Sequence, residues 1–174
     1  MLMRMLHKGG VEPYCDPESL GRGYEAHATL GLPRVAWLES VNDKAVKVLD
    51  PHRHRLPDDR EYAVILMTRD LREQAKSHQK FSAALQGKPS HLIDRRALEK
   101  TLRRDSPLVR TALSSLTNAR LLSLDFSFVL AEPLQAAQQI AELIAMPFDI
   151  GAAAASVHKR SPKCLPYIWE ATLQ

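Results

Sequence analysis

The sequence predicts a single α/β domain with a short, mostly parallel sheet. Three apolar runs, at residues 44–49, 62–68 and 120–126, have the length of buried strands and are bounded by polar or turn-forming residues. Helix-favouring segments separate the last two, and this alternation is typical of α/β proteins. The 174 residues suit one domain, and 45% hydrophobic residues are enough to form a core.

The remaining elements follow from helix start and stop signals. Gly9 and Gly10 end a helix at the N-terminus, and Asp70 is a candidate N-cap for the segment after the second strand. Pro107 interrupts the helical pattern in the middle of the chain, so two helices are expected there. In chain order, the predicted helices cover residues 1–8, 70–86, 90–104, 107–117, 133–145 and 149–158, with an irregular tail after them.

Composition narrows the function only slightly. The net charge of +4 suits an anionic small molecule as well as a nucleic acid. The two cysteines, Cys15 and Cys164, form neither a disulfide framework nor a metal-ligand pattern, so a cytoplasmic protein without a metal site is expected. No apolar run could span a bilayer, and no membrane partner is expected. The basic segment 95–104 lacks a recognised nucleic-acid motif, so a solvated face or a cap over a substrate pocket is the preferred interpretation.

An arginine and a serine follow the second predicted strand at a spacing that suits anion binding. Arg69 ends the apolar run, and Ser77 lies eight residues further on, a little over two helical turns. A guanidinium offers a fork of donors to a phosphate, and ligands of open α/β sheets bind beyond the carboxyl ends of strands. The alternative for an isolated pair of this kind is a surface arginine at a solvated helix start.

Several segments of the chain resemble bacterial sulfotransferase-like proteins, in the order in which that family has them. The Arg-x7-Ser pair after a strand is similar to the clamp with which sulfotransferases hold the 3′-phosphate of 3′-phosphoadenosine 5′-phosphosulfate (PAPS). The match covers about residues 1–145. The segments that carry it are GGVEPYCD (9–16), GYE (23–25), KAVKVLDPHRHRLP (44–57), VILMTRDLREQAKS (64–77) and LLSLDFSFVLAEPLQAAQQIAELI (121–144).

This resemblance implies a three-layer, P-loop-type fold and transfer of a sulfuryl group from PAPS to a hydroxyl or amine of a small molecule. Arg69 and Ser77 would hold the 3′-phosphate, and Lys47 aligns with a lysine near the leaving phosphate, although a structural lysine is the alternative. Phe126 would pack near the adenine or in the core.

The chain departs from the family at two places that matter for catalysis. The glycine-rich loop G-x-P-R-S-G-T-[ST], which precedes the first helix in the family, is absent, so the resemblance implies a chain that lacks the first strand and the main sulfonate site. The family's catalytic histidine position is Leu49, and His52 and His54 in the following loop are the substitutes, with simple solvation as the alternative for both. Little or no transferase activity is therefore expected of these 174 residues. The alternative is a non-catalytic nucleotide-binding or protein-interaction module, and open strand edges would allow a homo-oligomer.

Overall fold

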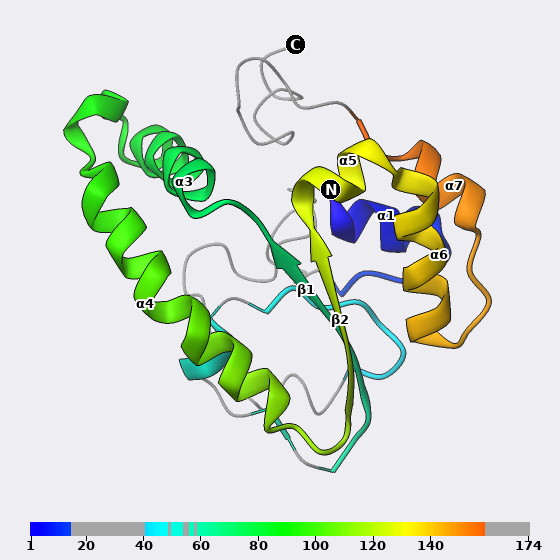
Figure 1. Ribbon diagram of the computed structural model, residues 1–174. Coiled ribbons are helices and arrows are strands. Elements are labelled where there is room, and N and C mark those ends of the chain that lie inside the picture. The colour runs from blue at the N-terminus through cyan, green and yellow to red at the C-terminus, as the bar shows by residue number, and fades with distance from the viewer. Residues whose placement is uncertain (15–40, 49, 54–55, 58, 159–174) are drawn as a thin grey trace.

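The computed structural model describes residues 1–14, 41–48, 50–53, 56–57 and 59–158 (Figure 1). Within these ranges the chain is mixed α/β, with six α-helices and one parallel pair of strands. The elements are α1 (Leu2–Lys8), the 3₁₀ turn η2 (Pro51–Arg53), β1 (Tyr62–Thr68), α3 (Leu71–Gln86), the 3₁₀ turn η3 (Ser90–Leu92), α4 (Arg95–Ser114), β2 (Ala119–Asp125), α5 (Phe126–Ala131), α6 (Pro133–Ile144) and α7 (Ile150–Ala155).

The two strands are parallel and directly hydrogen-bonded to each other over their whole length. Tyr62 pairs with Ala119 at one end and Thr68 with Asp125 at the other. At the second end, the Thr68 hydroxyl also donates to the carbonyl of Leu124 at 3.3 Å. The predicted strands at 62–68 and 120–126, and their parallel pairing, are confirmed, except that the second strand spans 119–125 and Phe126 starts α5.

The third predicted strand, at 44–49, is wrong in the part that the structure describes. Ala45 forms only an isolated parallel bridge with Pro13, held by two backbone hydrogen bonds of 2.8 Å. Asp43 and Asp50 have positive φ angles of 55° and 49°, a left-handed backbone that ends an extended segment on either side. The run is therefore too short and too bent to join the β1–β2 pair.

The predicted break at Pro107 is also wrong, because α4 runs continuously from Arg95 to Ser114 with this proline inside it. Asp94 caps the helix by accepting from the backbone N–H groups of Arg96 and Ala97 at 2.9 and 3.1 Å, so residues 90–94 lie outside it. Proline costs an interior helix one hydrogen bond, and packing of α4 on α3 compensates for that loss.

Four of the other helices agree with their sequence signals, whereas α5 was not predicted. α1, α3, α6 and α7 occupy the predicted segments to within a few residues, and Gly9 follows α1 directly. Asp70 caps α3, since its carboxylate accepts from the backbone N–H of Glu73 at 3.0 Å. In the described part of the chain, no helix is both long and apolar enough to cross a membrane.

The core lies between the strand pair and the helices α1, α5, α6 and α7. These helices occupy one side of the strands in Figure 1, and α3 and α4 occupy the other. Alternate strand residues, Ile65 and Met67 on β1 with Leu122 and Leu124 on β2, pack on this core. The buried residues are Met5, Leu6, Val11, Ala45, Leu124, Val129, Ala136, Ala137, Ile140 and Ala153. Packing of this kind fixes the strand ends, from which the candidate site projects.

Candidate functional site

The register of the two strands brings Arg69 and Phe126 side by side. Thr68 and Asp125 are the last paired residues, so the next residue of each strand lies at the same edge of the sheet. The guanidinium carbon of Arg69 lies 4.6 Å from the centre of the Phe126 ring. A cation over an aromatic ring is attracted by about 0.5–2 kcal/mol, depending on desolvation. Two residues that the sequence proposed for one nucleotide site are therefore in contact.

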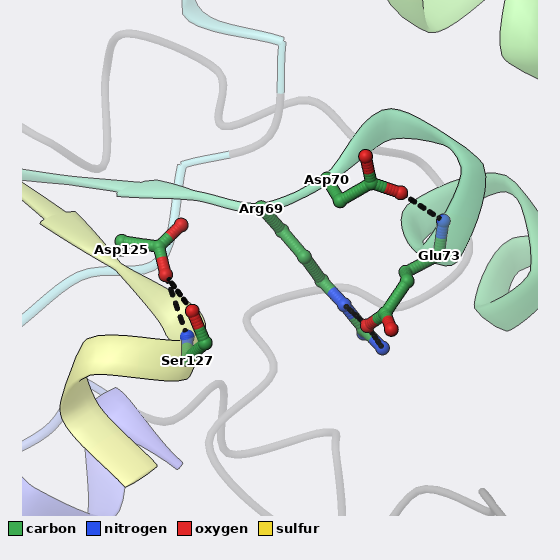
Figure 2. Close-up of polar contacts among 5 residues, drawn as sticks. All are labelled: Arg69, Asp70, Glu73, Asp125 and Ser127. Carbon is green, nitrogen blue, oxygen red and sulfur yellow. Dashed lines mark hydrogen bonds and ion pairs between the residues drawn. The ribbon is translucent and has the colours of Figure 1, made fainter. Parts of the chain in front are cut away.

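The Arg69 guanidinium is held by an ion pair within its own segment (Figure 2). One carboxylate oxygen of Glu73, Oε2, accepts from Nη2 at 3.2 Å and from Nε at 3.4 Å. The arginine side chain is 18% exposed and the glutamate 49%. A guanidinium has five N–H groups, and these bonds use two of them. Among the described residues no hydrogen-bond acceptor is found for the others, so the outer Nη edge is available to a ligand.

Two further carboxylates near this edge are engaged in capping helices rather than in binding Arg69 (Figure 2). Asp70 caps α3, and Asp125 caps α5 by accepting from the backbone N–H of Ser127 at 2.8 Å and from its hydroxyl. The hydrogen bond from the Ser127 hydroxyl is the main reason that the pKa of Asp125 lies below its ordinary value of 3.8. Among these described side chains, Glu73 is the carboxylate that pairs with Arg69.

The capping of α5 by Asp125 predicts an acid-sensitive contribution to stability. Because the pKa is lowered in the folded state, the unfolded chain binds more protons below pH 3.8, and the contribution is lost as pH falls through the folded pKa. Asp125→Asn keeps an acceptor oxygen but has no charge to lose. We expect the difference in urea midpoint between wild type and Asp125→Asn to narrow between pH 6 and pH 3. A difference that stays constant over this range would contradict the assignment.

His78 is a titratable group near Arg69 that sequence reasoning missed. Removal of water from its imidazole is the main cause of a pKa below the ordinary value of 6.5; Asp50 opposes this shift, and Arg69 and Lys47 add to it. His78 is nevertheless an exposed residue, so water is removed from only part of its imidazole. His78 is therefore a neutral, accessible imidazole near neutral pH. Lys47 and Arg69 each act electrostatically on this imidazole. The position of His78 directly after Ser77 was the available sequence signal.

The predicted pairing of Arg69 with Ser77 is interrupted by an acid. Glu73 lies one helical turn before Ser77 on the same face of α3, and it takes the hydrogen bonds of the guanidinium. Ser77 is partly buried. A phosphate that reached both Arg69 and Ser77 would have to pass close to a carboxylate.

His52 lies at a different place, on η2 against α4. Arg53 donates from Nε to its Nε2 at 3.4 Å, and its Nδ1 is buried without a hydrogen-bond partner in the described structure. Arg53 also approaches Asp105 of α4 at 3.7 Å. His52 is therefore part of the contact between η2 and α4. His54 and Leu49 lie outside the described residues.

No family model, curated protein or solved structure matches this chain. Within the described ranges, no three His, Cys, Asp or Glu side chains are grouped closely enough to hold a metal ion.

Proposed function

We propose that this chain is a sulfotransferase-type protein that binds PAPS or adenosine 3′,5′-bisphosphate, with Arg69 at the 3′-phosphate. The observation that carries the proposal is the Arg69 guanidinium, which lies on Phe126 at the carboxyl ends of two parallel strands with its outer edge available. Such an edge donates two parallel hydrogen bonds to a phosphate. This end of a parallel sheet is also where α/β proteins bind ligands.

With the family's glycine-rich loop in place, the proposed chemistry is transfer of a sulfuryl group to a hydroxyl or amine of a small molecule, on a P-loop-type fold. These 174 residues alone are expected to bind the nucleotide with little or no turnover. In this proposal, Arg69 and Ser77 hold the 3′-phosphate, the Phe126 ring supports Arg69, and Lys47 adds positive charge near the leaving phosphate. His78 is the neutral imidazole in this neighbourhood with the acid–base chemistry to accept a proton from the acceptor. The low cysteine content supports a reducing, cytoplasmic location.

A second candidate is a nucleotide-binding module without catalysis. The observation that favours it is the Arg69–Glu73 ion pair, because a carboxylate at 3.2 Å offsets the positive charge available to a phosphate. The two candidates share the Arg69 site. They differ in whether labelled PAPS is turned over with hydroxyl or amine acceptors, which a turnover assay measures directly.

The binding test compares Arg69→Ala with wild type. Adenosine 3′,5′-bisphosphate is expected to raise the melting temperature of wild type, and Arg69→Ala is expected to weaken binding by about 10- to 150-fold, or ~1.5–3 kcal/mol, through loss of a charge-assisted fork. Isothermal titration calorimetry gives the dissociation constants.

The matched control is Arg72→Ala, which removes an arginine of α3 that is 84% exposed and 3.9 Å from Glu99. It should bind like wild type. Adenosine 5′-phosphate, which lacks the 3′-phosphate, should bind wild type and Arg69→Ala equally. Equal affinity of wild type and Arg69→Ala for the bisphosphate would rule out this site.

A further inference from the structure

We propose that Glu73 determines the charge selectivity of the Arg69 site. Its carboxylate orients the guanidinium. Its negative charge makes the binding free energy less favourable in proportion to the charge of the bound anion, so dianions are weakened more than monoanions. The inference rests on the proposed function only in that Arg69 is an anion site. It holds whether that anion belongs to a nucleotide or to a simpler ester.

The orienting part follows from the two hydrogen bonds that converge on one oxygen. Because Glu73 Oε2 takes one N–H from Nε and one from Nη2, the guanidinium is fixed on the side that faces α3. The Phe126 ring fixes one of its faces at 4.6 Å. The edge that remains, Nη1 with the second N–H of Nη2, has the geometry for two parallel bonds to an oxyanion.

The selectivity part follows from charge. An anion on the outer edge of Arg69 lies within several ångströms of the Glu73 carboxylate, which is half exposed and therefore acts through water-like dielectric. At such separations, two unit charges in water interact strongly enough to change an equilibrium by about threefold. The free-energy penalty doubles for a dianion. Glu73 is therefore expected to weaken the binding of a dianion about tenfold and the binding of a monoanion about threefold.

The other charged groups around Arg69 do not lower the affinity for anions in this way. The carboxylates of Asp70 and Asp125 are committed to helix caps, and Lys47 and His78 contribute positive or no charge near neutral pH. Asp50 acts on His78 from the loop side. Glu73 is the carboxylate bonded to the guanidinium itself. For a 3′-phosphate, which is mostly dianionic at neutral pH, its presence favours exchange of bound nucleotide over tight retention.

The test compares two small esters of equal shape and different charge, methyl phosphate and methyl sulfate, at pH 8. Binding is followed by the Nε–Hε resonance of Arg69 in NMR titrations of wild type and Glu73→Gln. Glutamine keeps a carbonyl oxygen that can accept from Arg69, so the variant removes charge while retaining orientation. We expect Glu73→Gln to bind methyl phosphate about tenfold and methyl sulfate about threefold more tightly.

Two controls separate charge from other effects. Glu99→Gln removes the same charge from a side chain that is bonded to Arg103 of α4 at 3.1 Å, and it should leave both affinities unchanged. Arg69→Ala should abolish binding of both esters, which is followed in that variant by neighbouring backbone resonances. The proposal would be overturned if Glu73→Gln raised the affinity for both esters equally, left it unchanged or lowered it. It would also be overturned if neither ester bound to wild type. If the esters bind at Arg69 but adenosine 3′,5′-bisphosphate does not, the proposed function fails and the role of Glu73 stands.

Discussion

Leu124→Ala is expected to lower the free energy of unfolding by about 2–5 kcal/mol. Leu124 is 1% exposed and is one of the largest fully buried side chains among the described residues. It belongs to the same core as Val129 and Ile140, so truncation removes buried apolar surface and leaves a cavity between β2 and the helices behind it. Urea unfolding followed by circular dichroism measures the loss.

The matched control lies on the same strand. Leu121→Ala makes the same chemical change at a side chain that is 45% exposed, and it should cost less than about 1 kcal/mol. Leu124 also directly precedes Asp125, so loss of its side chain from the core should loosen the strand ends that hold Arg69 against Phe126. The Thr68 hydroxyl bonds to the backbone carbonyl of residue 124, which the variant keeps. Similar costs at the two leucines would show that β2 is not anchored by the core as described.

Local signals were sufficient for most elements. The apolar runs at 62–68 and 120–126 became strands, and capping and stop residues such as Asp70 and Gly9 marked helix ends correctly. These features depend on interactions within a few residues of the chain, so they can be read without tertiary information. The parallel pairing followed from the helices that separate the two runs.

The two errors arose where longer-range packing competes with a local signal. The run at 44–49 has strand-forming residues, but two left-handed aspartates flank it and its bridge goes to Pro13. Pro107 reads as a helix breaker, yet the helix around it is capped by Asp94 and packs on α3, and this outweighs one missing hydrogen bond. Neither outcome is visible in residue preferences alone.

Part of the candidate site was also predictable from local signals. Arg69 was selected because it follows a predicted strand. Phe126, expected as the last residue of another strand, was selected through the family resemblance, and the register then places the two side chains in contact. The Glu73 ion pair has an ordinary (i, i+4) spacing, which in most helices is only a solvated surface pair, so the sequence did not mark it as part of a site. His78 became relevant only once Asp50 and Lys47 were seen to act on it.

Gly9→Ala is expected to destabilise the fold by about 1–3 kcal/mol through overpacking. A methyl group at Gly9 would lie 2.0 Å from Cε2 of the Phe148 ring, far inside van der Waals contact. The backbone of Gly9 has an ordinary φ of −77°, so the constraint is space rather than conformation. Its carbonyl also accepts the backbone N–H of Asp149 at 2.9 Å, which docks the start of α7 on the end of α1. The alanine must therefore displace Phe148 from the core or separate the two helices, and thermal and urea unfolding measure the cost.

A double-mutant cycle with Phe148→Ala identifies the cause. If the ring is what excludes a side chain at Gly9, then Gly9→Ala should cost little once Phe148 has been truncated, and the two changes should be strongly non-additive. Gly151→Ala is the control, because its methyl group would meet only Asp149 Oδ1 at an ordinary 3.4 Å, and alanine is the better helix former in α7. That variant should be neutral or stabilised by up to about 1 kcal/mol. Additive losses in the cycle would mean that Gly9 is required for a reason other than the approach of Phe148, and the docking of α1 on α7 would need a different explanation.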